Sequence, residues 1–268
     1  MVASWPAAEQ DVSLMSRVLI GVIVLFVVVY AGLCVALFFF QRSLIYFPQQ
    51  RTFGSNETSD ILHASGADLI VTVRPMPSAN ALLYFGGNAE DVSVNLPSLS
   101  NVFPDYALYL LHYRGYGGSS GKPSEEALHS DALALFDKVH AEHSNIVVIG
   151  RSLGAGVAIR LASVRPVSRL VLVTPFDSLQ DLAVQQYPSV PVRWLLLDKF
   201  ESWRYAPRVG APTALLVAEN DEIIPAASSK LLYSRFAKGM ALYTVIAGVG
   251  HNSISESPAY LPALRGAP

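Results

Sequence analysis

The sequence is poor in cysteine and in charged residues, and both shortages limit what the chain can do. With a single cysteine, Cys34, it can form no disulfide within the chain and no cysteine-rich metal site. Charged residues make up only 15% of the chain, and the formal net charge is −2. A surface that binds nucleic acid needs a surplus of Lys and Arg, so we expect no nucleic-acid partner.

The uncharged run from Val18 to Phe40 predicts a membrane anchor. As a helix, its 23 residues extend over roughly 34 Å, whereas the hydrocarbon core of a bilayer is about 30 Å thick. The run is longer than the apolar region of a signal peptide, and no small-x-small cleavage site follows it. We therefore expect an N-terminal flank at 1–17, a retained single-pass transmembrane anchor at 18–40 and one catalytic domain at 41–268. Arg17 precedes the run and Arg42 and Arg51 follow it, so the positive charges favour neither orientation in the membrane.

Apolar runs of strand length alternate with helix-like segments after the anchor. The predicted strands are Leu69–Val73, Ala81–Phe85, Tyr106–Leu111, Ile146–Ile149, Leu170–Val173, Ala214–Val217 and Leu242–Ile246. The predicted helices are Ser124–His143, Leu153–Val164, Ala226–Ala237 and Pro258–Leu264. This alternation predicts an α/β fold, with a mostly parallel central sheet flanked by helices. In such sheets, active groups lie in loops at the carboxyl ends of the strands.

A segment rich in proline, at about 180–212, interrupts the alternation and predicts a short cap over the pocket. Its large apolar side chains could either line an apolar pocket or pack into the core, and the sequence favours neither. These side chains are Trp194, Leu195, Leu196, Leu197 and Trp203.

The pattern Gly150-Arg151-Ser152-Leu153-Gly154 fits G-x-S-x-G, the nucleophile elbow. A predicted strand precedes it and a helix rich in small residues follows it. The turn between them must be tight, which requires glycine at the flanking positions, and it lifts the serine hydroxyl clear of the sheet. We therefore predict that Ser152 is a nucleophile; the alternative is a glycine-rich packing turn.

His251 is the predicted base for Ser152, because a serine hydroxyl is a weak nucleophile and needs one. All other histidines of the chain precede Ser152, whereas the triad of this arrangement runs serine, acid, histidine along the chain. His140 and His143 have a spacing that can bind a metal, but no further ligand cluster accompanies them, so we expect them to be solvated.

Asp221 is the predicted acid that orients His251, because it follows the predicted strand at 214–217. Glu219 and Glu222 are close rivals in sequence, and Asp177 is a rival by topology, since it follows the strand at 170–173. The acid would hold the imidazole in one tautomer and stabilise the imidazolium.

The oxyanion hole needs two N–H donors. The amide of Leu153, next to the nucleophile, is the first candidate. Gly86-Gly87-Asn88 follows the strand that ends at Phe85, and the amide of Asn88 is the second; an ordinary glycine turn is the alternative. No nucleotide-binding motif is present, because Tyr116 and Pro123 stand where a P-loop needs Gly and Ser or Thr. We expect no cofactor and no metal.

An ordered set of motifs resembles the membrane-anchored α/β hydrolases of the serine aminopeptidase-like group. The resemblance covers nearly all of the chain after Arg17 and implies the catalytic triad Ser152, Asp221 and His251. Many members carry a histidine where Gly86 stands here. The motifs are Gln41–Pro48, Tyr84–Asp91, Tyr113–Gly117, the elbow, Thr174–Leu179, Asp221 and His251.

Relatives of this kind include esterases, thioesterases and lipid hydrolases besides peptidases. We therefore expect a serine hydrolase that cleaves an ester, thioester or amide through an acyl-enzyme intermediate. The anchor and the apolar cap favour an ester or a lipid-like acyl substrate. The alternative is a catalytically silent protein of the same fold that binds partners at the membrane.

Overall fold

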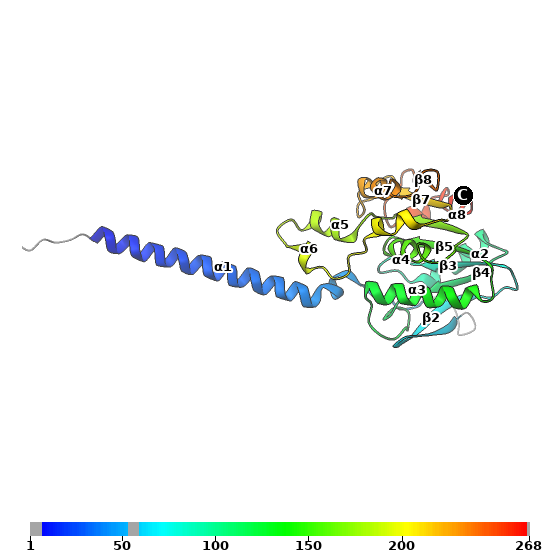
Figure 1. The fold of residues 1–268 in the computed structure, drawn as a ribbon, viewed down its shortest axis with the longest axis horizontal. Coiled ribbons are helices and arrows are strands. Elements are labelled where there is room, and N and C mark those ends of the chain that lie inside the picture. The colour runs from blue at the N-terminus through cyan, green and yellow to red at the C-terminus, as the bar shows by residue number, and fades with distance from the viewer. Residues whose placement is uncertain (1–6, 53–58, 267–268) are drawn as a thin grey trace, which may run out of the picture.

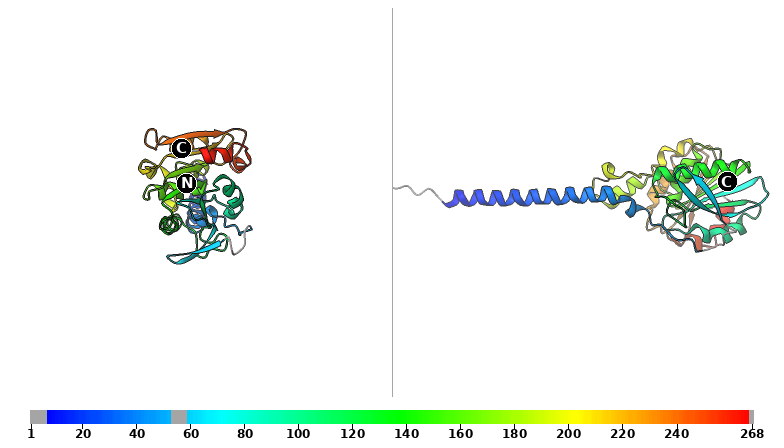
Figure 2. Two further views of the ribbon diagram at one scale, coloured as in Figure 1. Left: turned by 90° about the vertical axis from the view of Figure 1, so that its right-hand side faces the viewer. Right: turned by 90° about the horizontal axis from the view of Figure 1, so that it is seen from below.

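The computed structural model describes residues 7–52 and 59–266. Its first element is the helix α1 (Ala7–Ile45), which projects from the globular part as one long rod (Figures 1 and 2). The portion Leu14–Ile45 is long and apolar enough to cross a membrane. The helix is longer than the predicted anchor, because it continues through Gln41 and Arg42 and ends shortly before Pro48.

A sheet of eight strands, in the order β1-β2-β4-β3-β5-β6-β7-β8, forms the centre of the globular part. β2 pairs antiparallel with β1 and β4, and the other neighbours are parallel. The predicted α/β fold with a mostly parallel sheet is confirmed. The strands are β1 (Ser59–Ala64), β2 (Ala67–Arg74), β3 (Asn80–Phe85), β4 (Ala107–Leu111), β5 (Asn145–Arg151), β6 (Arg169–Val173), β7 (Thr213–Ala218) and β8 (Ala241–Ile246).

Helices cover both faces of this sheet, so its central strands are apolar on both sides. On one face, α3 (Glu125–His140), α4 (Leu153–Ala162) and α7 (Ala226–Tyr233) pack over a core that includes Val148. On the other face, η2 (Val92–Asn95), α2 (Leu96–Val102), η5 (Ile254–Glu256) and α8 (Tyr260–Gly266) enclose a second core that includes Val147.

Several elements, β1 and α2 among them, and one histidine differ from the sequence predictions. β1 was not predicted, because it is an edge strand in which only Leu62 is buried. α2 was not predicted, because it is short and carries Pro97 in its first turn. The expectation that His143 is solvated was wrong. The chain turns back after α3 and buries its imidazole, which hydrogen-bonds to the hydroxyl of Tyr109 and the carbonyl of Ser78.

The segment between β6 and β7 contains α5 (Leu179–Gln186), α6 (Val192–Leu195), η3 (Ser202–Arg204) and η4 (Ala206–Arg208). α5 and α6 extend from the globular part toward α1 (Figure 1). Trp194 is 87% exposed and Trp203 is 36% exposed, so neither is a core residue. The role of this segment as a cap stays a prediction.

Candidate active site

The turn between β5 and α4 presents Ser152 at the carboxyl end of the sheet. The serine has φ 50° and ψ −115°, a conformation that costs energy and is typical of functional sites. A Cβ at Gly150 would lie 2.4 Å from the carbonyl oxygen of Gly154, and one at Gly154 would lie 2.1 Å from that of Phe85. The tight approach of helix and strands at this turn therefore requires both glycines.

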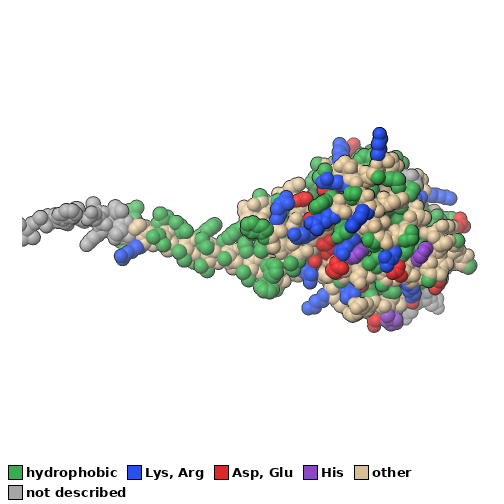
Figure 3. Space-filling view, viewed as in Figure 1, with side chains coloured by type: hydrophobic (Ala, Val, Ile, Leu, Met, Phe, Trp, Pro, Cys, Tyr) green, Lys and Arg blue, Asp and Glu red, His purple; other side chains and the backbone are tan. Residues whose placement is uncertain are grey.

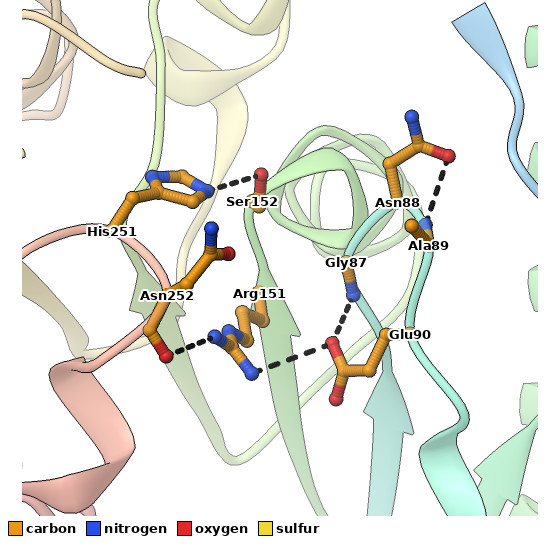
Figure 4. A pocket seen from close by; sticks show the side chains of 8 residues that line it. All are labelled: Gly87, Asn88, Ala89, Glu90, Arg151, Ser152, His251 and Asn252. Carbon is orange, nitrogen blue, oxygen red and sulfur yellow. Dashed lines mark hydrogen bonds and ion pairs between the residues drawn. The ribbon is translucent and has the colours of Figure 1, made fainter. Parts of the chain in front are cut away.

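His251 lies between Ser152 and Asp221, in hydrogen-bonding distance of both. Its Nε2 is 3.0 Å from Ser152 Oγ (Figure 4), and its Nδ1 is 3.0 and 2.9 Å from the two carboxylate oxygens of Asp221. The His251 and Asp221 side chains are only 5% and 2% exposed. Asp221 Oδ1 also accepts hydrogen bonds from the amides of Ile223 and Ile224, which fix the carboxylate. With Nδ1–H donated to Asp221, Nε2 is free to accept the proton of Ser152.

The two glutamates that rival Asp221 hold the backbone of the histidine loop instead of its imidazole. Glu222 Oε2 accepts a hydrogen bond from the His251 amide at 3.0 Å, and Glu219 accepts one from the Gly248 amide at 2.8 Å. The hydrogen bond from the His251 backbone lowers the pKa of Glu222 below its usual range. Both glutamates therefore position the loop through its backbone amides.

Asp177, the rival by topology, is committed to another contact. It is buried after the end of β6 and lies 3.2 Å from the guanidinium of Arg235. The backbone amide of Asp177 also points away from His251, because it donates a hydrogen bond to Ser228 Oγ at 3.1 Å.

The loop after β3, which contains Asn88, lies close to Ser152. A small cavity of about 110 Å³ is lined by Gly87, Asn88, Ser152 and His251, among others (Figure 4). Gly87 approaches so closely that a Cβ there would lie 3.5 Å from Ser152 Cβ. The amide of Leu153 is the first of α4 and has no acceptor within its own helix. Asn88, Ser152 and Leu153 all line the larger cavity described below.

A carboxylate that we did not single out from the sequence, Glu90, braces this loop. Its Oε2 accepts from the Gly87 amide at 2.5 Å, and its Oε1 accepts from Tyr84 Oη at 2.6 Å and from Asn95 Nδ2 at 2.7 Å. Arg151, which precedes the nucleophile, lies 3.8 Å from Oε2 (Figure 4). The available signal was a carboxylate three residues after a glycine of the loop.

Gly86, which replaces the histidine of many relatives, has no room for a side chain. A Cβ there would lie 2.4 Å from Val92 Cγ1. Its carbonyl accepts a hydrogen bond from the buried Tyr113 hydroxyl at 2.9 Å. Tyr113 and Glu90 thus supply the hydrogen bonds that steady the loop.

The side chain of Asn88 ties the same loop to the end of α1. Its Oδ1 accepts from the Phe47 amide at 3.0 Å and from Tyr116 Oη at 2.9 Å, and its Nδ2 donates to the carbonyl of Ile45. The end of the long helix is therefore part of the scaffold of the site.

A larger cavity of about 600 Å³ opens beside Ser152 and is mostly apolar. The apolar side chains come from the end of α1, from α5 and from the loops after β6 and β7: Leu44, Ile45, Phe47, Phe176, Leu179, Leu182, Tyr187, Leu196, Ile223 and Ile224. Among the described residues, no group of three or more His, Cys, Asp or Glu side chains could hold a metal ion.

Comparisons with known proteins agree with this architecture. Residues 80–201 match the family described as "alpha/beta hydrolase fold". The uncharacterized protein Rv2307c of Mycobacterium tuberculosis is 35% identical over 264 residues, which cover 91% of this chain and 92% of that protein. The lysophosphatidylserine lipase ABHD12 of Macaca fascicularis is 30% identical over 197 residues, which cover 64% of this chain and 49% of the lipase.

Solved structures show the same fold at lower sequence identity. The Pyrococcus furiosus esterase Pf2001 superposes with a TM-score of 0.65 at 17% identity, covering 82% of this chain and 97% of the esterase. The mouse alpha/beta hydrolase domain-containing protein 10 superposes with a TM-score of 0.62, also at 17% identity, covering 77% of this chain and 95% of that protein.

Proposed function

We propose, from the premise that this chain belongs to the α/β-hydrolase family, that it is a serine hydrolase that cleaves acyl esters through an acyl-enzyme intermediate. The observation that carries the proposal is the alignment of Ser152 Oγ, the His251 imidazole and the Asp221 carboxylate, with successive distances of 3.0 and 2.9 Å. These three groups come from separate loops at the carboxyl ends of the strands, and a packing turn would not need them to meet.

In the proposed reaction, Ser152 Oγ attacks the ester carbonyl while His251 Nε2 takes its proton. Asp221 holds the imidazole tautomer and stabilises the imidazolium that forms. The amides of Asn88 and Leu153 donate hydrogen bonds to the oxyanion of the tetrahedral intermediate. His251 then gives the proton to the leaving alcohol, and water releases the acyl group by the same steps in reverse. These steps transfer protons and an acyl group among Ser152, His251, the ester and water.

The substrate we propose is a lipid-like ester with a long acyl chain. The cavity of about 600 Å³ beside Ser152 supports this choice, because its apolar lining offers a hydrocarbon chain a favourable transfer from water. The apolar helix α1 ends at the cavity and supports a membrane location for the substrate. Two of the similar proteins are themselves named as a lipase and an esterase.

The test is hydrolysis of nitrophenyl esters from acetate to palmitate by the full-length protein in detergent. We expect kcat/KM to rise with acyl length, and we expect Ser152→Ala to lower kcat at least about a thousandfold. Ser234→Ala, which removes an exposed hydroxyl at the end of α7, is the matched control and should have no effect. A preference confined to acetate would contradict the lipid-sized pocket. Equal turnover by Ser152→Ala would contradict the assignment of Ser152 as nucleophile. A folded but inert wild-type protein would favour the alternative, a catalytically silent protein that binds partners at the membrane.

A further inference from the structure

The segment around α6 lies alongside the long helix and follows it for some distance. The Tyr30 hydroxyl donates to the Ser189 carbonyl at 2.7 Å. Further along the helix, Gln41 Nε2 donates to the Leu195 carbonyl at 3.1 Å, and its Oε1 accepts from the Leu197 amide at 2.7 Å. Tyr30 and Gln41 are separated by about 16 Å along a helix axis. The chain from Ser189 to Leu195 therefore runs beside α1 over this length, where Figure 1 shows α6 next to the helix.

A buried charge fixes the end of α1 to the same segment. Asp198 is 3% exposed and accepts hydrogen bonds from the Arg42 guanidinium at 3.0 and 3.3 Å and from the Tyr46 hydroxyl at 3.1 Å. Asp198 is buried, so removing Arg42 would leave its charge without a cationic partner, which is unfavourable. α1 is therefore fixed to the globular part, and its depth in the membrane determines the depth of the α6 segment.

The position of Arg17 sets how far the hydrocarbon reaches along α1. A charged side chain is costly within hydrocarbon, so the apolar layer begins at or after Arg17. Tyr30 lies about 20 Å further along the helix and Gln41 about 36 Å, whereas the layer is about 30 Å thick. The contact between Tyr30 and Ser189 thus falls about 10 Å inside the far boundary, and Gln41 falls just outside it. A tilt of α1 places the contact deeper still.

We propose that the tip formed by residues 187–192 is immersed in the membrane leaflet next to the globular part, with Arg193, Trp194 and Leu195 at the interface, at the level of Gln41. The partner of this surface is the lipid leaflet itself. The exposed side chains agree with that placement: Trp194 is 87% and Tyr187 is 58% exposed, and both residue types concentrate at membrane interfaces. Apolar side chains continue along α1 to this junction, and most of the charged side chains lie on the globular part (Figure 3). Arg193, within the α6 segment, pairs with Asp181.

The immersed tip places the mouth of the large cavity at the leaflet. Tyr187 lines that cavity together with Leu44 at the end of α1, and Leu44 is 59% exposed. An acyl chain can therefore pass from the leaflet toward Ser152 without crossing water. This last step rests on the proposed function, whereas the immersion of the tip does not.

The experiment measures depth with nitroxide labels on the full-length protein in lipid nanodiscs. In a Cys34→Ala background, the labels are attached at Ser189→Cys and at Trp194→Cys. Ser189 contacts Tyr30 through its carbonyl, so the substitution keeps that hydrogen bond. The control is Asp105→Cys, an exposed position just before β4, at the opposite edge of the sheet from the site.

We expect the labels at 189 and 194 to be several-fold less accessible to a nickel chelate than the label at 105, and more accessible to oxygen. Equal nickel accessibility at all three positions would overturn the proposal. A second measurement uses the native side chain: brominated lipids should quench tryptophan fluorescence, and Trp194→Phe should remove most of that quenching. Persistence of the full quenching in Trp194→Phe would also overturn the placement. Neither readout depends on catalysis, so failure here is distinguishable from failure of the proposed function.

Discussion

Replacing Glu90 by glutamine should slow catalysis without removing any group of the proposed triad. Glu90 accepts from Gly87, Tyr84 and Asn95 and faces Arg151 at 3.8 Å. Glutamine has one acceptor oxygen where glutamate has two. Its NH₂ group must therefore face hydrogen-bond donors that one carboxylate oxygen of Glu90 now accepts from. Each buried donor left unpaired costs about 1–3 kcal/mol.

The catalytic effect of Glu90→Gln follows from the loop that Glu90 braces. Whichever way the amide turns, Glu90→Gln loses a hydrogen bond that holds this loop, either from Gly87 or from Tyr84 and Asn95. The loop carries the proposed Asn88 oxyanion amide, and complete loss of one oxyanion donor costs about 10²–10³ in kcat. A loosened donor should cost less, so we expect kcat to fall about 10- to 100-fold, with KM little changed. Turnover of a short, water-soluble ester in detergent measures this, with thermal unfolding as the check on folding.

The matched control is Glu126→Gln, because the Glu126 side chain is 78% exposed and pairs only with Arg160 at the surface. Such a pair contributes less than about 1 kcal/mol, so we expect wild-type kcat and stability. A wild-type kcat in folded Glu90→Gln would refute the bracing argument. Equal losses in both variants would show that the effect is not specific to the loop.

Three further predictions concern the triad, the elbow and the buried histidines. Asp221→Asn should keep the fold but lower kcat by about 10³–10⁴, because an amide favours the wrong imidazole tautomer; steady-state kinetics test this, and a loss below tenfold would contradict it. Gly154→Ala should destabilise the protein by about 1–3 kcal/mol or more, since the new Cβ would lie 2.1 Å from the Phe85 carbonyl oxygen. The control Gly210→Ala, whose Cβ would have no atom within 4 Å, should be neutral. Thermal unfolding measures both, and equal unfolding temperatures would contradict this prediction. Burial lowers the pKa of both His112 and His129 to about 4, from 6.5. The unfolded chain therefore binds protons between these values that the folded chain does not, and the free energy of unfolding should fall as the pH drops from 6.5 to 4, by on the order of 3 kcal/mol for each histidine. Denaturant unfolding at pH 7 and pH 4.5 measures this, and a double variant, His112→Asn with His129→Gln, that keeps the full pH dependence would contradict it.

The central strands were predictable from the sequence because they are buried on both faces and therefore read as continuous apolar runs. The edge strand β1 was not, since only Leu62 of its residues is buried and its pattern resembles a loop. The full length of α1 was also not predictable. Polar Gln41 and Arg42 continue the helix because distant residues, Leu195 and Asp198, accept their hydrogen bonds.

The sequence also points to Ser152 and His251. The elbow around Ser152 is a local motif, and His251 is the one histidine of the sequence that follows it. The choice of Asp221 over its neighbours is harder, since three carboxylates lie within a few positions of one another. Only the three-dimensional arrangement assigns Glu219 and Glu222 to backbone amides. The carboxylate three residues after Gly87 is a local signal, but the full bracing role of Glu90 depends on contacts with β3, η2 and β5 that only the fold brings together.

Covalent labelling of the full-length protein with a fluorophosphonate, followed by mass spectrometry of the adduct, tests most directly whether Ser152 is an activated nucleophile. We predict one adduct on the peptide that contains Ser152, none in Ser152→Ala, and labelling slowed by orders of magnitude in His251→Ala. A folded wild-type protein that forms no adduct, or an adduct that persists in Ser152→Ala, would contradict the central claim that Ser152 is an activated nucleophile.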